Sequence, residues 1–171
     1  MAVQTTDALE AYSVSLLRFE ENYLLLQRSQ NKEFAPGRWT GLGGHIETDE
    51  FTHLRAAGLR EIQEEAGFSP ADISDFSFRR ALLVSRPNQP LRVVLYFTGD
   101  LRKAETPNCP EGILSWKQVP EFEALDIIET TRSVFKCLIE DMEHDPKGTG
   151  LLKVGLAVFD CDGEFQHVVW G

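Results

Sequence analysis

The fold is decided by the stretch Gly43-Gly-His-Ile-Glu-Thr-Asp-Glu50 and, after nine further residues, Arg60-Glu-Ile-Gln-Glu-Glu-Ala-Gly-Phe68. Helical periodicity runs through residues 52–66. Gly67 follows at the position where helix ends favour glycine. The sequence therefore predicts a glycine-rich turn that leads into one amphipathic helix.

Three carboxylates share one face of this predicted helix. At about 100° per residue, Glu64 lies about 60° to one side of Glu61, and Glu65 lies about 40° to the other. Carboxylates this close repel one another unless cations neutralise them, and their hard oxygen atoms suit Mg²⁺ or Mn²⁺. An isolated glutamate-rich helix face is more often solvated surface, but the glycine turn before it and the glycine stop after it favour a site. The expected buried side consists of apolar residues, Leu59, Ile62 and Ala66.

Strand-like segments flank this helix along the chain. Alternating polarity and β-branched or aromatic residues predict strands at residues 12–19, 23–27, 76–84, 91–98, 113–117, 153–159 and 165–170. A second amphipathic helix is predicted at residues 129–143. No internal repeat or long linker interrupts the pattern, so we expect one α/β domain over residues 1–171, with residues 1–10 forming a flexible N-terminus.

Composition narrows the class of protein. With 42% hydrophobic and 26% charged residues, the chain is typical of a globular domain, and no apolar run of about 18 residues predicts a membrane span. The net charge of −10 opposes binding to a nucleic-acid polymer or an anionic membrane, but not to a small anion that arrives with metal ions. No secretory signal is visible, so we expect a cytoplasmic protein, as a monomer or a homodimer. The cysteines show no zinc or redox spacing, so we expect buried free thiols at Cys109, Cys137 and Cys161.

The stretch at residues 43–68 resembles the Nudix box, Gly-x5-Glu-x7-Arg-Glu-U-x-Glu-Glu-x-Gly-U, in which U is a bulky apolar residue. Gly44 and Glu50 match its first half, and the run from Arg60 to Phe68 matches all of its second half. Nine residues rather than seven separate Glu50 from Arg60, which we interpret as a two-residue lengthening of the loop or of the helix start. This departure bears on the role of Glu50 more than on the helix glutamates.

The resemblance extends over residues 12–170. It is carried further by Phe34-x-x-Gly-Arg-Trp39, the predicted strand at 91–97, the segment Glu111-Gly-Ile-Leu-Ser-Trp116 and the C-terminal hairpin. These segments are similar to the branch of the family that hydrolyses nucleoside triphosphates, including oxidised-purine ones. The resemblance implies an α/β/α sandwich on a mixed β-sheet and Mg²⁺-dependent hydrolysis of a small nucleotide-like substrate.

The resemblance also implies roles for the polar residues of the box. The expected metal ligands are the carbonyl oxygen of the turn and acidic side chains, Gly43, Glu61, Glu64, Glu65 and Glu50. The expected catalytic residues are Glu64, Glu61, Arg60 and Glu111. Arg60 is expected to orient a carboxylate, because Glu64 lies four residues on in the helix. Glu50 either binds metal or holds Arg60. Glu111 either binds metal or acts as a base, unless it is an exposed turn residue.

Further residues are candidates for contact with the substrate. Phe34, Phe97 and Trp116 are expected to line or support a base pocket, because flat rings stack on bases, although strand aromatics are more often core. His45 is expected to meet a phosphate, or else to be structural. Cations on the loop before the box offer charge to a polyphosphate, Arg28, Lys32 and Arg38. Acidic side chains stand where oxidised-purine enzymes present theirs to the base, Asp126 and Glu129, but no tryptophan accompanies them, and Thr40 replaces a frequent asparagine.

The expected reaction is attack by a metal-activated water on a nucleoside diphosphate linked to a further group, with a glutamate accepting the proton. A nucleoside triphosphate would give the monophosphate and pyrophosphate. Dinucleoside polyphosphates, ADP-ribose and nucleotide sugars remain alternative substrates. A regulatory module that binds a nucleotide without hydrolysing it, and a purely structural acidic domain, are rival readings from other classes.

Overall fold

The computed structural model of the chain describes residues 9–87 and 89–171. Its strands are β1 (Glu10–Phe19), β2 (Asn22–Arg28), β3 (Trp39–Thr40), β4 (Ile73–Val84), β5 (Arg92–Leu101), β6 (Gly112–Lys117), β7 (Lys153–Phe159) and β8 (Phe165–Trp170). Its α-helices are α1 (Leu54–Ala66) and α2 (Glu129–His144). Short 3₁₀ helices span Thr48–Glu50, Pro70–Asp72 and Val119–Ala124.

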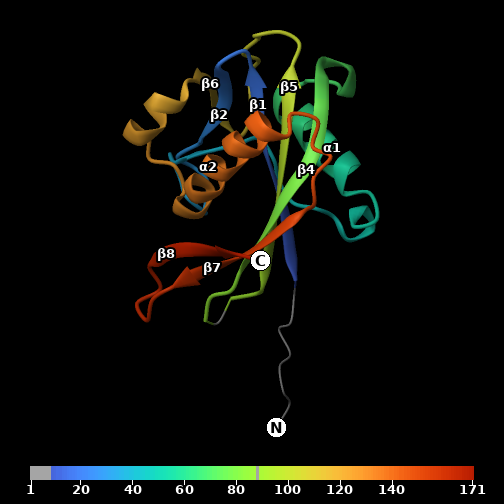
Figure 1. Cartoon of the computed structure of the whole chain (residues 1–171). Coiled ribbons are helices and arrows are strands. Elements are labelled where there is room, and N and C mark those ends of the chain that lie inside the picture. The colour runs from blue at the N-terminus through green and yellow to red at the C-terminus, as the bar shows by residue number, and fades with distance from the viewer. Residues whose placement is uncertain (1–8, 88) are drawn as a thin grey trace.

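The strands form one mixed β-sheet of eight strands. Its order is β3-β2-β1-β5-β4-β7-β8, and β6 pairs with β2 off this path. The β1–β5 and β4–β7 pairs are parallel, and all other named pairs are antiparallel. Figure 1 shows α1 and α2 beside the central strands, with the β7–β8 hairpin extending the sheet away from them. The predicted α/β sandwich on a mixed sheet is thereby confirmed.

Strand alternation builds a core on each face of the sheet. Neighbouring residues of a strand point to opposite faces, so Leu16 packs in the cluster under α2 while Leu17 packs in the cluster under α1. The predicted buried side of α1, Leu59, Ile62 and Ala66, joins the second of these clusters. The cluster under α2, which contains Leu16, receives from that helix Val134, Phe135, Leu138 and Met142. Each helix is therefore held by one apolar stripe, which leaves its polar face free.

Several boundaries differ from the sequence predictions. β3 is a short strand that the sequence did not predict, and it forms because Trp39 and Thr40 pair with β2. β4 begins at Ile73, three residues before the predicted start, through a 3₁₀ turn and a bulge. The predicted flexible N-terminus falls outside the described residues for positions 1–8, while Glu10 already belongs to β1 and its carboxylate pairs with Arg92 at 2.9 Å.

The prediction of three buried thiols is wrong. Cys161 is exposed at the tip of the β7–β8 hairpin, and Cys109 and Cys137 are only partly buried. The tip is a tight turn in which Asp160 accepts the backbone N–H groups of Asp162 and Glu164. Such a turn faces solvent, and Cys161 faces solvent with it.

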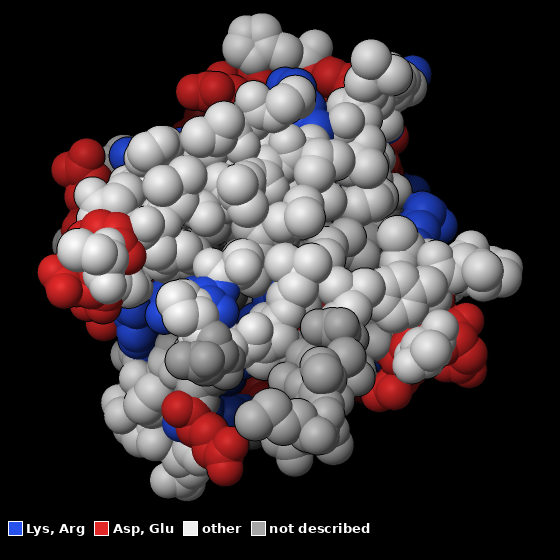
Figure 2. All heavy atoms as spheres, turned by 90° about the horizontal axis from the view of Figure 1, so that it is seen from below, with Lys and Arg blue, Asp and Glu red and all other residues white. Residues whose placement is uncertain are grey.

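Surface charge is unevenly spread. Figure 2, seen from below, shows a broad uncharged surface with Asp and Glu gathered at its margins. The β7–β8 hairpin adds exposed apolar side chains, Val154, Leu156 and Val169. Within the described part of this face, Lys and Arg form no continuous basic patch. No described helix is both long enough and apolar enough to cross a membrane.

Candidate active site

The acidic face of α1 is divided between buried and exposed carboxylates. Glu61 and Glu65 are buried, with 8% and 7% of their surface exposed. The side chain of Glu64 lies between them along the helix but remains 59% exposed. Gly67 ends the helix in the left-handed conformation at φ 68°, as the sequence predicts. The apolar stripe of α1 thus fixes two of the three carboxylates at the edge of the core.

The glycine turn brings backbone atoms against the two buried carboxylates. The amide of Gly43 donates to Oε2 of Glu65 at 2.7 Å. A Cβ on Gly44 would lie 2.3 Å from Oε2 of Glu61, and a Cβ on Gly43 would lie 2.0 Å from the carbonyl oxygen of Ser13. A side chain at Gly43 would therefore push the turn away from β1, and one at Gly44 would displace the carboxylate of Glu61. The two glycines are needed for this close approach.

Arg60 ties the acidic face to the loop before the helix. Its guanidinium meets Glu50 through two bonds, Nε to Oε1 at 2.6 Å and Nη2 to Oε2 at 2.8 Å. Nη1 also reaches Glu64 at 2.9 Å and Glu61 at 2.8 Å. The hydrogen bond from Arg60 is the main reason that the pKa of Glu50 falls to about 2. In this arrangement Glu50 holds Arg60, which is one of its two predicted roles.

The lengthened spacing between Glu50 and Arg60 is accommodated before the helix. Thr48–Glu50 forms a 3₁₀ turn, and the chain passes through Phe51, Thr52 and His53 before α1 begins at Leu54. Glu50 and Arg60 are in contact across these nine residues, because the chain folds back in the loop between the 3₁₀ turn and α1.

Cations among the described residues pair with only part of this acidic face. Burial raises the pKa of Glu65 to about 8, against the lowering effect of the Gly43 amide, and repulsion from Glu61 and Glu111 adds to the rise. Burial likewise raises the pKa of Glu61, although Arg60 opposes it. No cationic side chain among the described residues forms an ion pair with Glu65, whereas Arg60 forms ion pairs with Glu61 and Glu64. Among the described residues, no three acidic, His or Cys side chains are already gathered closely enough to hold a metal ion.

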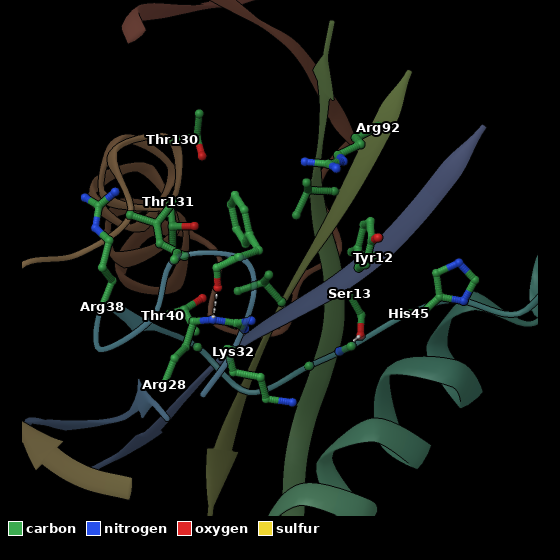
Figure 3. Close-up of a pocket in the computed structure, with 18 of the residues that line it drawn as sticks. Tyr12, Ser13, Arg28, Lys32, Arg38, Thr40, His45, Arg92, Thr130 and Thr131 are labelled. Carbon is green, nitrogen blue, oxygen red and sulfur yellow. Dashed lines mark hydrogen bonds between the residues drawn. The ribbon is translucent and has the colours of Figure 1, made fainter. Parts of the chain in front are cut away.

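A cavity of about 970 Å³ opens beside these carboxylates. It is bounded by the α1 carboxylates, the glycine turn, the loop between β2 and β3, the start of α2, and the tip of the β7–β8 hairpin. Glu111 enters the cavity from the loop before β6, where it pairs with Lys32. In Figure 3, Arg38 and Thr131 lie across the cavity from His45 and Tyr12. The cavity is large enough for a nucleotide-sized ligand.

Two of the predicted cavity residues contribute side chains to it directly. Phe34 is 56% exposed, and the centroid of its ring lies 5.8 Å from the guanidinium carbon of Arg28 and 5.8 Å from that of Arg92. His45 lines the cavity and meets Tyr12 edge-on at 5.5 Å. Both therefore stand where a ligand would touch them.

Arg38 and Asp126 form a structural contact instead. Arg38 lines the cavity, but its guanidinium is bound by Asp126 at 2.9 Å, by Glu129 at 2.8 Å and by the carbonyl oxygen of Ile127 at 2.9 Å. Asp126 does not line the cavity. This network fastens the loop before β3 to the start of α2, so it positions the cavity wall and leaves Arg38 no free face for an anion.

Phe97 and Trp116, which we expected to line or support a base pocket unless they belonged to the core, do not line the cavity. Phe97 is fully buried under α1 and stacks on Phe76 and Phe78, each at 5.1 Å. Trp116 packs against Phe19 at 6.2 Å between ring centroids. The part of the cavity that β5 lines lies on the opposite face of the sheet, where the neighbouring residue Tyr96 contributes to it. Sequence reasoning missed Tyr96, although strand alternation would have paired it with Phe97 as its opposite.

Comparisons with known proteins agree with this geometry. The NUDIX domain model matches residues 9–138. The m7GpppN-mRNA hydrolase NUDT17 of Xenopus laevis is 37% identical over 62 residues, which are 36% of this chain and only 20% of that protein.

Solved structures share the fold at low identity. The mutator MutT protein from Bacillus halodurans has a TM-score of 0.62 and 18% identity, with 94% of this chain and 97% of that chain covered. The MutT protein from Methanosarcina mazei has a TM-score of 0.64 and 24% identity, with 83% of this chain and 99% of that chain covered. The NUDIX domain of Shewanella oneidensis NrtR, solved with ADP ribose, has a TM-score of 0.64 and 17% identity, covering 83% and 94%.

Proposed function

The chain belongs to the NUDIX family of hydrolases, and we propose that it uses Mg²⁺ to hydrolyse a phosphate–phosphate bond in a nucleoside triphosphate, whether ordinary or oxidised in its purine. Family membership itself supports the coarser activity, hydrolysis of a nucleoside diphosphate linked to a further group. The products of the proposed reaction are the nucleoside monophosphate and pyrophosphate.

One observation carries the proposal. Glu61 and Glu65 are buried against the Gly43–Gly44 turn, and Glu65 has no cationic partner among the described residues. A buried carboxylate without a counter-charge is costly. Its position beside the mouth of a nucleotide-sized cavity supports a site where a divalent ion is the missing charge.

The donor set fits Mg²⁺ or Mn²⁺. Glu61, Glu64 and Glu65 offer hard carboxylate oxygens. The carbonyl oxygen of Gly43 is a further candidate ligand, because no backbone amide in the described residues donates to it. Glu64 is exposed enough to turn from Arg60 toward a bound ion. Glu50 is committed to Arg60 by two short bonds, so we assign it to orientation rather than to metal binding. Bound divalent ions would lower the pKa of a water and neutralise phosphate charge.

The remaining groups act on the substrate and on the proton. Arg60 orients Glu61 and Glu64, since its Nη1 atom bonds both. Glu111 lines the same cavity as Glu65 and lies close enough to raise its pKa, and it is assigned as the proton acceptor or as a further metal ligand. Arg28 forms no ion pair with a described carboxylate and lies near Glu65, so it is available for a phosphate. Lys32 can release Glu111 and contact the same phosphate group.

A substrate panel tests the proposal. The protein is incubated with Mg²⁺ and ATP, GTP, 8-oxo-dGTP, a dinucleoside polyphosphate, ADP-ribose or a capped dinucleotide, and the products are identified. The last two compounds follow the ligand and the activity in the names of two similar proteins. We expect pyrophosphate and a monophosphate from triphosphates. Binding of these compounds without product from any of them would instead identify a nucleotide-binding module.

A further inference from the structure

The β7–β8 hairpin ends the sheet in an open edge. Among the described strands, β8 comes last in the sheet order and pairs with β7 alone (Figure 1). The amide of Gly171 donates to the carbonyl oxygen of Val154, and bonded and non-bonded pairs of the two antiparallel strands alternate from that point. This register turns the N–H and C=O groups of Val168 and Trp170 outward, away from β7. No backbone group in the described residues bonds to them there.

The residues of β8 do not protect this edge. Edge strands that stay unpaired usually carry Lys, Pro or an inward-pointing charge. The strand Phe165–Trp170 contains no Lys, Arg, Asp, Glu or Pro. A single irregularity interrupts its pairing with β7, between Val158 and Phe159, and it lies near the hairpin tip. The rest of the edge is therefore a template on which a further strand can pair.

One face of the hairpin is apolar and uncovered. Strand alternation and the register of β7 and β8 put Val154, Leu156 and Val169 on the same face, with Leu156 directly opposite Val169. Their residues are 45%, 48% and 52% exposed. The other face of β8 packs toward α2 through Val168 and Trp170. The exposed face thus offers apolar contacts to a further strand, directly beside the open main-chain groups.

We propose that this edge pairs with β8 of a second copy of the chain, in an antiparallel arrangement. A two-fold axis beside Val169 sets Val168 of each copy opposite Trp170 of the other, so that their outward groups form about four main-chain hydrogen bonds. Val169 then meets its counterpart at the axis, where the side chains of a non-bonded pair lie closest. Leu156 flanks this contact in each copy. The same patch serves both sides, as a two-fold interface requires.

Charge favours a second copy in this direction. The hairpin tip is acidic, with Asp160, Asp162 and Glu164. Lys153 lies at the other end of the hairpin, where its side chain is 50% exposed and pairs with Asp141 at 3.2 Å. Antiparallel pairing sends the two acidic tips to opposite ends of the joined strands and brings each to the level of Lys153 in the other copy. A parallel pairing would place the two tips together, and their repulsion opposes it.

Sedimentation equilibrium of the whole chain, in about 0.15 M salt, tests the pairing. We expect a monomer–dimer equilibrium with a dissociation constant on the order of 10 µM, as is typical of a small interface. Amide exchange at Val168 and Trp170 should slow as the protein concentration rises through this range. The amide of Val169, which already faces β7, should change less. A monomer at about 200 µM, or exchange at Val168 and Trp170 that does not depend on concentration, would overturn the proposal.

Variants of the hairpin test the assigned surface. Val169→Lys should raise the dissociation constant at least about tenfold, because it sets two like charges against each other at the axis. Ile113→Lys is the matched control, because Ile113 is 66% exposed on β6, which pairs with β2 alone among the described strands.

Val168→Pro provides a second break that does not depend on the lysine variant. It removes an outward N–H group but none of the hydrogen bonds to β7, as proline on an edge strand allows. It should weaken the dimer as well, and melting temperatures show whether each variant folds. Dimers that persist unchanged in folded hairpin variants, or that dissociate in the Ile113 variant, would overturn the proposal.

Discussion

Replacing Glu65 by glutamine should stabilise the metal-free protein at alkaline pH. Burial raises the pKa of Glu65 to about 8 in the folded chain, against an ordinary value of 4.5. The folded state therefore holds its proton more tightly than the unfolded state does. The contribution of Glu65 to stability is therefore highest below pH 4.5, where its carboxyl is protonated in both states, and it falls as the pH rises through 8. Glutamine stays neutral and still accepts the amide proton of Gly43.

The magnitude follows from the two pKa values. The difference between the ordinary pKa of 4.5 and the pKa of about 8 in the folded chain lowers the unfolding free energy of the wild type at pH 9 by at most about 5 kcal/mol. Glu65→Gln should regain this amount. For a chain of this size such a change raises Tm by about 10–20 °C. The gain should vanish near pH 4, where the wild-type carboxyl is neutral as well. It should also shrink in Mg²⁺, because a bound cation supplies the missing counter-charge to the wild type only.

Thermal and urea unfolding in EDTA at pH 4, 7 and 9 provide the measurement. Glu64→Gln is the control, because its side chain is mostly exposed and its pair with Arg60 contributes no more than about 1 kcal/mol. The reasoning is refuted if Glu65→Gln is no more stable than the wild type at pH 9 in EDTA. An equal gain in the Glu64 variant would also refute it, since burial would then not be the cause.

Three further predictions concern activity and packing. Glu64→Gln should keep the fold but lower kcat by about two orders of magnitude or more at saturating Mg²⁺, and wild-type turnover in a steady-state assay would refute its metal role. Gly44→Ala should weaken Mg²⁺ binding in calorimetry, because its methyl group would lie 2.3 Å from a carboxylate oxygen of Glu61 and would displace that carboxylate; unchanged binding would speak against the close approach. Asp141→Asn should cost about 3–5 kcal/mol in urea unfolding at pH 7, because it leaves the buried Arg80 uncompensated. Burial raises the pKa of Asp141, but hydrogen bonds from Arg80 and Lys153 lower it by more, so that the net pKa lies below 3.8. The higher unfolding free energy of the wild type should therefore persist at neutral pH and fade below pH 3.8.

Local patterns in the sequence were sufficient to predict the main elements. The apolar stripe of α1 and the glycine after it define the helix and its end, and both are found where expected. That Glu61, Glu64 and Glu65 share one face of α1 follows from helical geometry alone. What spacing could not predict was their unequal burial, because that depends on how the Gly43–Gly44 turn packs against α1.

Long-range contacts account for the errors. Tyr96 and Phe97 are adjacent aromatic residues in β5, and alternation says only that they face opposite sides of the sheet. Which side holds the cavity is decided by α2 and by the β7–β8 hairpin, whose tip residue Phe165 lines it from about seventy positions away along the chain. Likewise, the sequence could not decide whether Glu50 holds Arg60 or binds metal, because the answer depends on how the loop before α1 folds.

The central claim is that the acidic face of α1 binds divalent cations beside the cavity. The most direct measurement is anomalous diffraction from crystals of the protein soaked in Mn²⁺. The account predicts strong anomalous peaks bounded by Glu61, Glu64 and Glu65, with oxygen atoms about 2.2 Å away and Arg60 still bound to Glu50. An absence of anomalous density there, with Glu65 still bonded only to the Gly43 amide, would contradict it.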